Sequence, residues 1–420
     1  MSMEFKKYKL GEICTIIPGY AFKANDFGKG NNIVVKIADL KPPYIDVDEA
    51  DHASYTPKES RTQIKRGDFA MAMTGATIGK IGMLIQDVEN VYINQRVCTF
   101  IPKEGFDKGF LFYLLSQERF RQFVLANVDS SSAQPNIGHN TLYTYEQEMP
   151  SIEYQKRIAS VLSNLDSKIA LNRAINQNLE ALAKQIYDYW FVQFDFPDEN
   201  GRPYKSSGGK MVWNELLKRG IPVGWEVKSV NDVSSICRGV SYKPNDLQES
   251  GVLILRGNNI ENNHVVYDNN TAYLLPNMIS EEQKIKKHDI IITMSSGSKE
   301  HIGKCAMFQK DSEHSFGAFL SKITPQEECP YFLFLYLSSL YFKQKIKSIC
   351  NGTGINNLTN QTFDEVKFAY PTKSVLLSFE RSLQPIFDMI GINESENNTL
   401  ARQRDELLPL LMNGQVEMEN

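Results

Sequence analysis

The sequence predicts an α+β protein in which two similar, mixed but mostly β domains are joined by two long helices that form an antiparallel coiled coil. Three observations predict this fold class. The chain repeats itself over half its length, each repeat opens with short strand-like segments, and each repeat ends in a long heptad pattern. We expect a dumbbell with a pseudo-twofold axis across the middle of the helix pair.

The repeat is visible at an offset of 220 residues. Residues 5–27 read FKKYKLGEICTIIPGYAFKANDF and residues 225–247 read WEVKSVNDVSSICRGVSYKPNDL, so that Gly19 matches Gly239. The match continues at slightly larger offsets to the end of each unit. The chain therefore contains two copies of one unit of about 200 residues, and it is not an array of small repeats.

The first part of each unit is predicted to be globular. Short β-branched and aromatic segments, separated by turns rich in Gly, Pro and Asn, predict strands. They lie at Asn32–Ile37, Phe69–Met73, Val252–Leu255 and Asp289–Met294. One apolar stretch per unit predicts a helix, over Phe110–Phe123 and over Tyr331–Ile346. The polar, turn-rich segment Pro197–Gly224 between the units has the composition of a linker.

Each unit ends in a predicted amphipathic helix whose heptad stripe covers 33 residues, a length of about 48 Å. The stripe of the first unit is Ile158, Leu162, Leu165, Ile169, Asn172, Asn176, Leu179, Ala183, Ile186 and Trp190. The stripe of the second is Phe379, Leu383, Ile386, Ile390, Asn393, Asn397, Leu400, Arg404, Leu407 and Leu411. This 3.5-residue spacing is typical of a coiled-coil seam.

Two asparagines lie near the middle of each stripe and are predicted to fix the coiled-coil register. An antiparallel pairing aligned end to end places Asn172 beside Asn397 and Asn176 beside Asn393. A slip of one heptad would leave amides facing leucines, at roughly 1–3 kcal/mol for each unsatisfied group. Parallel pairing fits the asparagines equally well, and two unrelated surface helices are the remaining alternative. The chain order, a globular part and then a helix, favours the antiparallel form.

Composition excludes a broadly basic coat protein but leaves room for local basic grooves. The chain has 46 Lys and Arg against 50 Asp and Glu, a net charge of −4. Residues 380–420 carry eight acids and three bases, so the rest of the chain is at +1. The six cysteines form no CxxC pair, which argues against a zinc ribbon and for reduced core thiols. Without a long apolar segment or signal core, a cytoplasmic location is expected.

No motif for catalysis, nucleotides or metal survives inspection. The segment 75–81, GATIGKI, has three residues between its glycines where a P-loop needs four, and it ends in Ile. A glycine turn between strands is the better interpretation. In KPPY at 41–44, Lys41 replaces the acceptor that an amino-methyltransferase motif needs, so a rigid loop is expected. His288, His301 and His314 are scattered, without a cysteine nearby, so neither a metal site nor a Ser/Cys–His pair is indicated.

The ordered set of motifs resembles the specificity subunits of type I restriction-modification systems over nearly the whole chain. The matching segments are PSIEYQKRI at 150–158, NLEALAK at 178–184, YDYWF at 187–191, IPVGWE at 221–226 and RDELLPLLMNG at 404–414. The second helical region departs from the pattern, because LSFER at 377–381 replaces the EYQKR entry. The resemblance implies two target-recognition domains, 1–150 and 225–372, two helical regions, 151–196 and 373–420, and a linker at 197–224.

Candidate DNA-reading residues are polar loop residues, because bases are read by Arg, Lys, Asn and Gln, and phosphates are held by Lys, Arg, Ser and Thr. In the first unit they are Tyr20, Lys23, Thr74, Lys80, Asn94, Gln95, Arg96, Ser131, Gln134 and Asn136. In the second they are Tyr242, Lys243, Ser295, Ser298, Lys299, Lys304, Asn351, Thr353, Asn356 and Asn357. Any one of them could be an ordinary solvated turn residue, but both copies place polar loops at matching positions while the contents differ.

The resulting hypothesis is a DNA-specificity subunit without catalytic residues or a metal of its own. The resemblance implies that each domain reads one half of a bipartite double-stranded DNA site. It also implies that the helices recruit two methyltransferase subunits, that restriction subunits then join, and that S-adenosylmethionine, ATP and Mg belong to those partners. The main alternative is a non-catalytic helical tether that presents two protein-binding domains. A self-contained methyltransferase comes third, because the cofactor motifs are absent.

Overall fold

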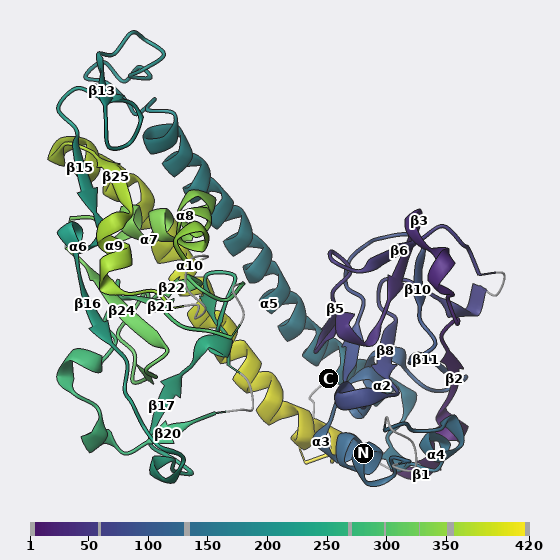
Figure 1. Cartoon of the computed structure of the whole chain (residues 1–420). Coiled ribbons are helices and arrows are strands. Elements are labelled where there is room, and N and C mark those ends of the chain that lie inside the picture. Colours follow the sequence, from purple (N-terminus) through teal and green to yellow (C-terminus); the bar gives the residue numbers. More distant parts are fainter. Residues whose placement is uncertain are drawn as a thin grey trace. The chain divides into compact units, whose positions relative to one another are not determined.

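The computed structural model describes residues 5–57, 60–129, 135–267, 271–297, 300–326, 328–350 and 357–415. The chain forms two compact units, which Figure 1 shows coloured along the sequence. Unit 1 comprises residues 1–170 and 397–420, and unit 2 comprises residues 171–396. Each unit therefore contains a globular domain and a stretch of both long helices.

Unit 1 is built on two sheets and a short strand pair. The six-stranded sheet has the order β2 (Cys14–Pro18), β11 (Val97–Pro102), β8 (Phe69–Ala72), β9 (Ile81–Met83), β5 (Tyr44–Ile45) and β4 (Leu40–Lys41). The four-stranded sheet has the order β6 (Asp51–Ala53), β3 (Phe27–Val35), β10 (Val91–Ile93) and β7 (Gln63–Ile64). Strand β1 (Lys6–Lys9) pairs antiparallel with β12 (Glu146–Met149), close to the start of the long helix.

Unit 2 repeats the central part of this topology. Its four-stranded sheet has the order β16 (Ser234–Arg238), β24 (Leu320–Pro325), β21 (Ile290–Thr293) and β22 (Cys305–Met307), as β2, β11, β8 and β9 do in unit 1. Its globular domain also contains β20 (Tyr273–Leu274), β17 (Val252–Leu255) and β23 (Ser315–Phe316), the hairpin β18 (Ile260–Glu261) and β19 (His264–Val265), and the pair β15 (Glu226–Ser229) and β25 (Lys367–Tyr370). The structure thus confirms the predicted strand regions and the repeat.

The short helices differ from the prediction of one apolar helix per unit. Unit 1 has α2 (Lys108–Leu115) and α3 (Glu118–Ala126) where one helix was expected, and unit 2 has α7 (Pro330–Ser338) and α8 (Leu340–Cys350). Serine explains both breaks, because its side chain competes for backbone groups at a helix end. Ser116 Oγ donates to Phe112 O at 2.7 Å, and Ser339 Oγ accepts from Phe342 N at 3.2 Å.

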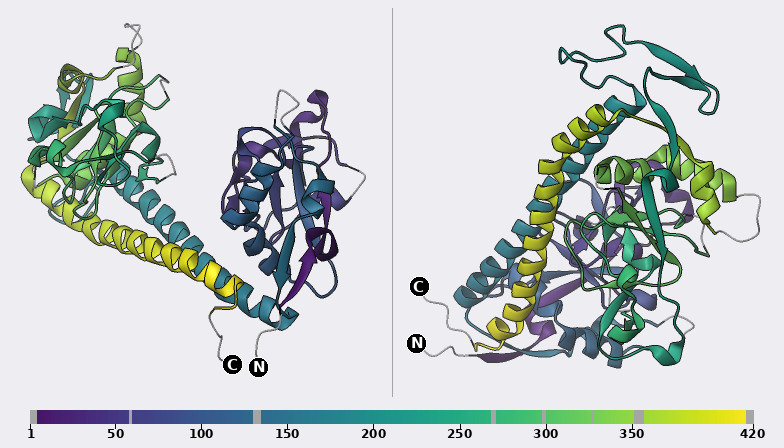
Figure 2. Two further views of the ribbon diagram at one scale, coloured as in Figure 1. Left: turned by 90° about the horizontal axis from the view of Figure 1, so that it is seen from below. Right: turned by 90° about the vertical axis from the view of Figure 1, so that its left-hand side faces the viewer.

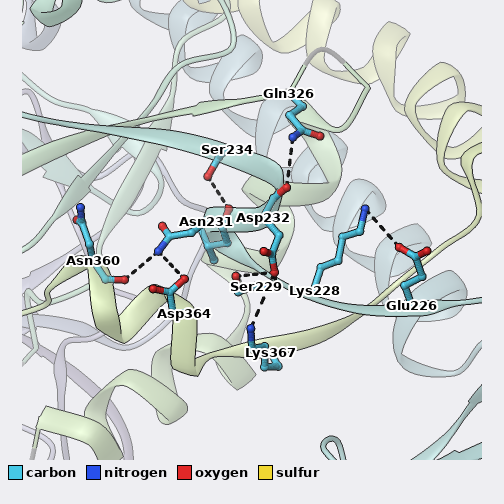
Figure 3. A network of polar contacts seen from close by, with 11 residues as sticks. Glu226, Lys228, Ser229, Asn231, Asp232, Ser234, Gln326, Asn360, Asp364 and Lys367 are labelled. Atoms are coloured by element: carbon cyan, nitrogen blue, oxygen red, sulfur yellow. Dashed lines mark hydrogen bonds and ion pairs between the residues drawn. The ribbon is translucent and has the colours of Figure 1, made fainter.

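Among the described residues, the shorter α-helices are α1 (Leu10–Ile13), α4 (His139–Tyr143), α6 (Val230–Val233) and the six-residue α9 (Asn360–Glu365). In unit 2, a polar network ties α6 to α9 and β25 (Figure 3). Asn231 Nδ2 donates to Asn360 O at 3.0 Å and to Asp364 Oδ1 at 2.8 Å. Lys367 Nζ lies 3.9 Å from Asp232 Oδ2. These contacts hold α6, α9 and β25 of the second domain together.

The segment predicted as a linker contains ordered structure. Strands β13 (Met211–Asn214) and β14 (Arg219–Pro222) form an antiparallel hairpin within it. Tyr204 and Met211 pack against the core of unit 2, and the Tyr204 ring stacks on Phe196 at 4.6 Å between centroids. The few apolar residues among the polar ones of this segment anchor it to the core.

The two long helices are α5 (Ile152–Tyr187), which continues into a π-helical turn at Asp188–Val192, and α10 (Lys373–Met412). Both contain the predicted stripes. In unit 2 they run antiparallel and pack through the buried Ala183, Leu383 and Ile386 (Figure 2). In unit 1 the buried Leu162 and Leu411 belong to the core of the first domain. None of the helices in the described ranges combines the length and apolar character needed to cross a bilayer.

Candidate nucleic-acid interface

The turn Asn94–Val97 is where the loops of the first domain meet. The turn is closed by Val97 N, which donates to Asn94 O at 2.8 Å, and it joins β10 to β11. Tyr20 N donates to Ile93 O at 2.9 Å, and Met73 N donates to Arg96 O at 2.9 Å. Backbone bonds from two other loops therefore hold this turn in place.

The second domain builds the same turn over Gly317–Leu320. Leu320 N donates to Gly317 O at 2.8 Å and closes it. Val240 N donates to Phe316 O at 2.8 Å, as Tyr20 N does to Ile93 O. Met294 N donates to Phe319 O at 2.9 Å and takes the part that Met73 plays in unit 1. The two domains thus share this loop crossing bond for bond.

A second crossing lies next to each turn and joins predicted site residues. Thr74 forms an antiparallel bridge with Asn136, and Ser295 forms the same bridge with Asn357. All four were predicted from the sequence, and the structure brings each pair together at the end of a central strand, β8 or β21. The offset of 221 residues is the same for both partners.

Glycine is required where the first loop approaches the turn. A Cβ atom on Gly19 would lie 2.1 Å from Asn94 O, and one on Gly239 would lie 2.2 Å from Gly317 O. Any side chain would push the two backbones apart. The Gly19–Gly239 match in the sequence therefore has a structural cause, which is the close passage of one loop across another.

The described lysines among the predicted residues lie directly before or after tight turns. Lys23 N donates to Asp26 Oδ2 at 2.6 Å, and Lys243 N donates to Asp246 Oδ2 at 2.7 Å, with both lysine side chains exposed. Lys80 is exposed and follows the turn that contains Gly75–Thr77.

The turn at Gly75–Thr77 connects β8 to β9, as the sequence predicted for the glycine-rich segment. Gly79 has a φ of 80°, and Gly303 before the half-buried Lys304 has a φ of 75°. Both copies therefore use a left-handed glycine to present a lysine after the turn.

The two predicted tyrosines are not equivalent. Tyr20 stacks on Tyr55 with 5.4 Å between ring centroids, and a hydrogen bond with Tyr55 raises the pKa of Tyr20. Tyr242 packs beside Val240 in a small apolar cluster, at a position that corresponds to Phe22. The tyrosine pair at 20 and 55 is thus a feature of unit 1.

Seven predicted residues lie outside the described part of the chain and stay predictions. They are Ser131, Gln134, Ser298, Lys299, Asn351, Thr353 and Asn356.

One exposed residue of the turn was not predicted from the sequence. Gln95 and Arg96 are exposed in the turn of unit 1, whereas Ala318 and the 69 % exposed Phe319 occupy the same places in unit 2. The prediction was based on polar residue types, so it did not include the apolar pair Ala318 and Phe319. The signal was present, because an offset of 223 aligns residues 92–97 with residues 315–320.

The predicted residues of these loops carry amide, hydroxyl, phenol and cationic groups, which are the kinds of group that contact phosphates and base edges in protein–DNA complexes. Across the described ranges, no three His, Cys, Asp or Glu side chains come together as metal ligands would.

Three of the four predicted asparagines, all except Asn397, lie at the helix contact in unit 2. Asn393 Nδ2 donates to Asn176 Oδ1 at 2.8 Å, and Asn176 Nδ2 donates to Ile390 O at 3.3 Å. Asn172 Nδ2 donates to Glu396 Oε2 at 2.7 Å. The structure therefore places Asn176 against Asn393 as expected. The pairing of Asn172 with Asn397, which belongs to unit 1, stays a prediction, as does the role of all four in setting the register.

Comparison with known proteins gives one consistent result. A family model described as the type I restriction modification DNA specificity domain matches the chain twice, over residues 3–181 and 222–400. The HindI type I restriction enzyme specificity subunit of Haemophilus influenzae is 24 % identical over 98 % of this chain and 100 % of its own length. The StySPI specificity subunit of Salmonella potsdam is 36 % identical over 37 % of this chain and 35 % of its own.

A solved structure supports the fold. The crystal structure of a type I restriction-modification S subunit from M. genitalium superimposes with a TM-score of 0.57 at 16 % identity, covering 99 % of this chain and 97 % of the other.

Proposed function

Because the chain belongs to the type I restriction-modification DNA specificity family, we propose that it is the DNA-specificity subunit of a type I restriction-modification complex. Each globular domain reads one half of a bipartite double-stranded DNA site, and the helices dock methyltransferase subunits. The chain itself performs no catalysis. S-adenosylmethionine, ATP and Mg are cofactors of the partner methyltransferase and restriction subunits.

The observation that carries this proposal is the repeated loop crossing with different contents. Both domains hold a four-residue turn with the same backbone hydrogen bonds. The central pair of that turn is Gln95 and Arg96, both exposed, in one domain, and the half-buried Ala318 and the exposed Phe319 in the other. A shared scaffold with different exposed side chains is what two readers of different sequences require.

The outer face of α5 supports the docking of a partner subunit. Leu171, Ile175 and Leu182 are 56, 38 and 44 % exposed, and Tyr189 on the π-helical turn that follows is 39 % exposed. The spacings of four and seven residues place the three α5 side chains in one heptad stripe beside the seam that faces α10. An exposed apolar stripe of this kind suits a partner helix. We assign it to the methyltransferase subunits, two of which join one copy of this chain.

Methylation mapping tests the proposal. The chain is produced together with its cognate methyltransferase subunit, and modified bases are located by sequencing genomic DNA from the expressing cells. We expect one bipartite motif with an unspecified gap. Replacing residues 1–150 by those of a relative with other turn residues should change one half of the motif. A change in both halves, or methylation without any bipartite motif, would contradict the proposal.

A binding assay separates DNA reading from a purely structural tether. The purified complex should bind duplexes that carry the motif, with an affinity that falls as salt rises, because phosphate contacts release counterions. A tether for protein partners would show neither the motif preference nor this salt dependence.

A further inference from the structure

The turn that both domains build is rigid. In unit 2, Met294 N and Ser295 N both donate to Phe319 O, at 2.9 and 3.3 Å, and Gly317 N donates to Leu255 O at 2.9 Å. In unit 1, Asn94 N donates to Val35 O at 2.9 Å in the corresponding place. Three neighbouring segments therefore fix the backbone on both sides of the two central residues. The backbone that presents these side chains is therefore fixed before a ligand binds, which lowers the entropic cost of binding.

The central residues of the turn play no part in the core. Phe316 and Leu320, on either side of the pair in unit 2, are fully buried, whereas Phe319 is 69 % exposed. Within the described ranges, the Gln95 and Arg96 side chains take no hydrogen-bond or ion-pair partner. Holding these side chains on a fixed backbone, without internal contacts, leaves them available to a ligand.

The two pairs differ in what they can recognise. Arg96 can donate two hydrogen bonds to the O6 and N7 atoms of guanine, and Gln95 can pair with the N6 and N7 atoms of adenine. Ala318 and Phe319 have no side-chain donor or acceptor. They can contact the C5-methyl group of thymine in the major groove. We propose that this turn is the base-reading element of each domain, with Arg96 specifying guanine in one half-site and Phe319 specifying thymine in the other.

This inference rests on the proposed function, and it adds which residues determine specificity and which base each of them selects. It also explains why the second domain carries a large exposed aromatic ring at a position that contributes nothing to its core. The flanking lysines and hydroxyls would then hold phosphates and orient the domain without selecting a base.

The experiment uses the full chain with its methyltransferase subunit and the same methylation mapping. Arg96→Ala should relax one guanine position in one half-site, with roughly a tenfold loss of discrimination there. Phe319→Ala should relax one thymine position in the other half-site. Phe319→Arg should replace that thymine by guanine. The matched controls are Arg66→Ala and Trp213→Ala, which remove an exposed cation from unit 1 and a 60 % exposed aromatic ring from unit 2.

The outcomes separate the inference from the proposed function. If the wild-type complex methylates a bipartite motif and the folded turn variants leave it unchanged, the base-reading role of the turn is wrong and the proposed function stands. A relaxed position other than guanine for Arg96, or other than thymine for Phe319, overturns the base assignment. If the wild-type complex methylates no bipartite motif, both fall. Thermal melting of each variant confirms folding, and Gln95→Ala provides a milder second test of the turn in unit 1.

Discussion

The two domains are attached to the long helices at corresponding places with different chemistry. Where the apolar helix α2 begins in unit 1, Asp107 N donates to the buried amide of Gln155 on α5 at 2.9 Å. Where α7 begins in unit 2, the N–H groups of Tyr331 and Phe332 donate to the buried carboxyl of Glu380 on α10 at 3.1 and 2.8 Å. The start of the apolar helix is therefore held by a neutral amide in unit 1 and by an ionisable carboxyl in unit 2.

A second attachment shows the same contrast. In unit 1, the β4–β5 hairpin brings Tyr44 to the backbone of Asp166, whose carboxyl accepts from Tyr113 Oη at 2.6 Å and Arg404 Nη1 at 2.8 Å. In unit 2, the matching hairpin, 220 residues later, brings His264 to the helices.

The His264 ring lies between two carboxylates. Its Nε2 atom is 3.0 Å from Glu180 Oε1, and its Nδ1 atom is 3.0 Å from Glu394 Oε1. Unit 1 thus relies on an amide and a guanidinium that keep their charge state near neutral pH. Unit 2 relies on a glutamate and a histidine, so its attachment should depend on pH.

The largest expected effect comes from breaking the ion pair of unit 1. Arg404→Ala leaves the Asp166 carboxyl, 12 % exposed, without its cation. Removing one partner of a buried pair costs about 3–5 kcal/mol, because the remaining charge is uncompensated. All three tryptophans lie in unit 2. The urea midpoint measured by circular dichroism, which reports on both units, should therefore decrease. The midpoint measured by tryptophan fluorescence, which reports on unit 2, should stay the same.

The control for this prediction is Arg402→Ala, which removes an exposed arginine two residues away on the same helix. We expect it to change the free energy of unfolding by less than about 0.5 kcal/mol. Equal effects of the two substitutions would show that the pair with Asp166 contributes nothing.

The second prediction concerns the carboxyl of unit 2. Burial raises the pKa of Glu380 to about 7, although its two backbone donors act in the opposite direction. The folded unit then binds more protons than the unfolded chain between about pH 4.5 and 7, so its stability falls as the pH rises through this window. Glu380→Gln should remove this slope, which should amount to about 1–3 kcal/mol across the window. Because the two backbone N–H groups donate to different carboxyl oxygens, the amide keeps one acceptor and should lower the stability of unit 2 at pH 4.5.

Tryptophan fluorescence during urea unfolding, repeated from pH 4.5 to 8, measures the slope. Glu249→Gln, an exposed glutamate of the same unit, is the matched control and should keep the wild-type pH dependence. A wild-type protein whose tryptophan transition stays constant from pH 4.5 to 7 would rule out the burial effect.

The sequence predicted the architecture better than it predicted the contacts that attach each domain to the long helices. The repeat and the heptad stripes predicted the two similar domains, both long helices and the contact of Asn176 with Asn393, because periodicity and offset are properties of many residues. Asp166 could not be found this way, since it lies beside the stripe and its partner Tyr113 is 53 residues away.

The site residues show where prediction from residue types reaches its limit. Thr74 and Asn136 were predicted from polarity and their position in loops, and they do meet. Phe319 was not among the predicted residues, because it is apolar and its exposure depends on a backbone turn that its residue type does not indicate. The equivalent roles of Gln155 and Glu380 were hidden because they lie at different offsets within their helices.

The smallest expected effect is the contribution of the charged His264 ring to the stability of unit 2. Its two carboxylate neighbours raise the pKa of the imidazole to about 10, against the effect of burial. The contribution of the charged ring to stability is complete below about pH 6.5 and is lost as the pH rises through 10. The side chain is 35 % exposed, so solvent screening reduces the expected contribution to about 1 kcal/mol at neutral pH.

His264→Gln keeps a hydrogen-bonding group beside Glu180 and Glu394 but removes the charge. It should lower the stability of unit 2 by about 1 kcal/mol at pH 7 and by almost nothing at pH 10.5, as followed by tryptophan fluorescence in urea. The exposed His301, replaced by Gln, is the control and should have no effect at either pH. His264→Tyr installs the residue that unit 1 has at this position, Tyr44, and should also make the attachment independent of pH up to about 9, since a phenol stays neutral there. If the loss for His264→Gln is the same at pH 7 and at pH 10.5, the ring acts through its shape and not through its charge, and the contrast between the two attachments disappears.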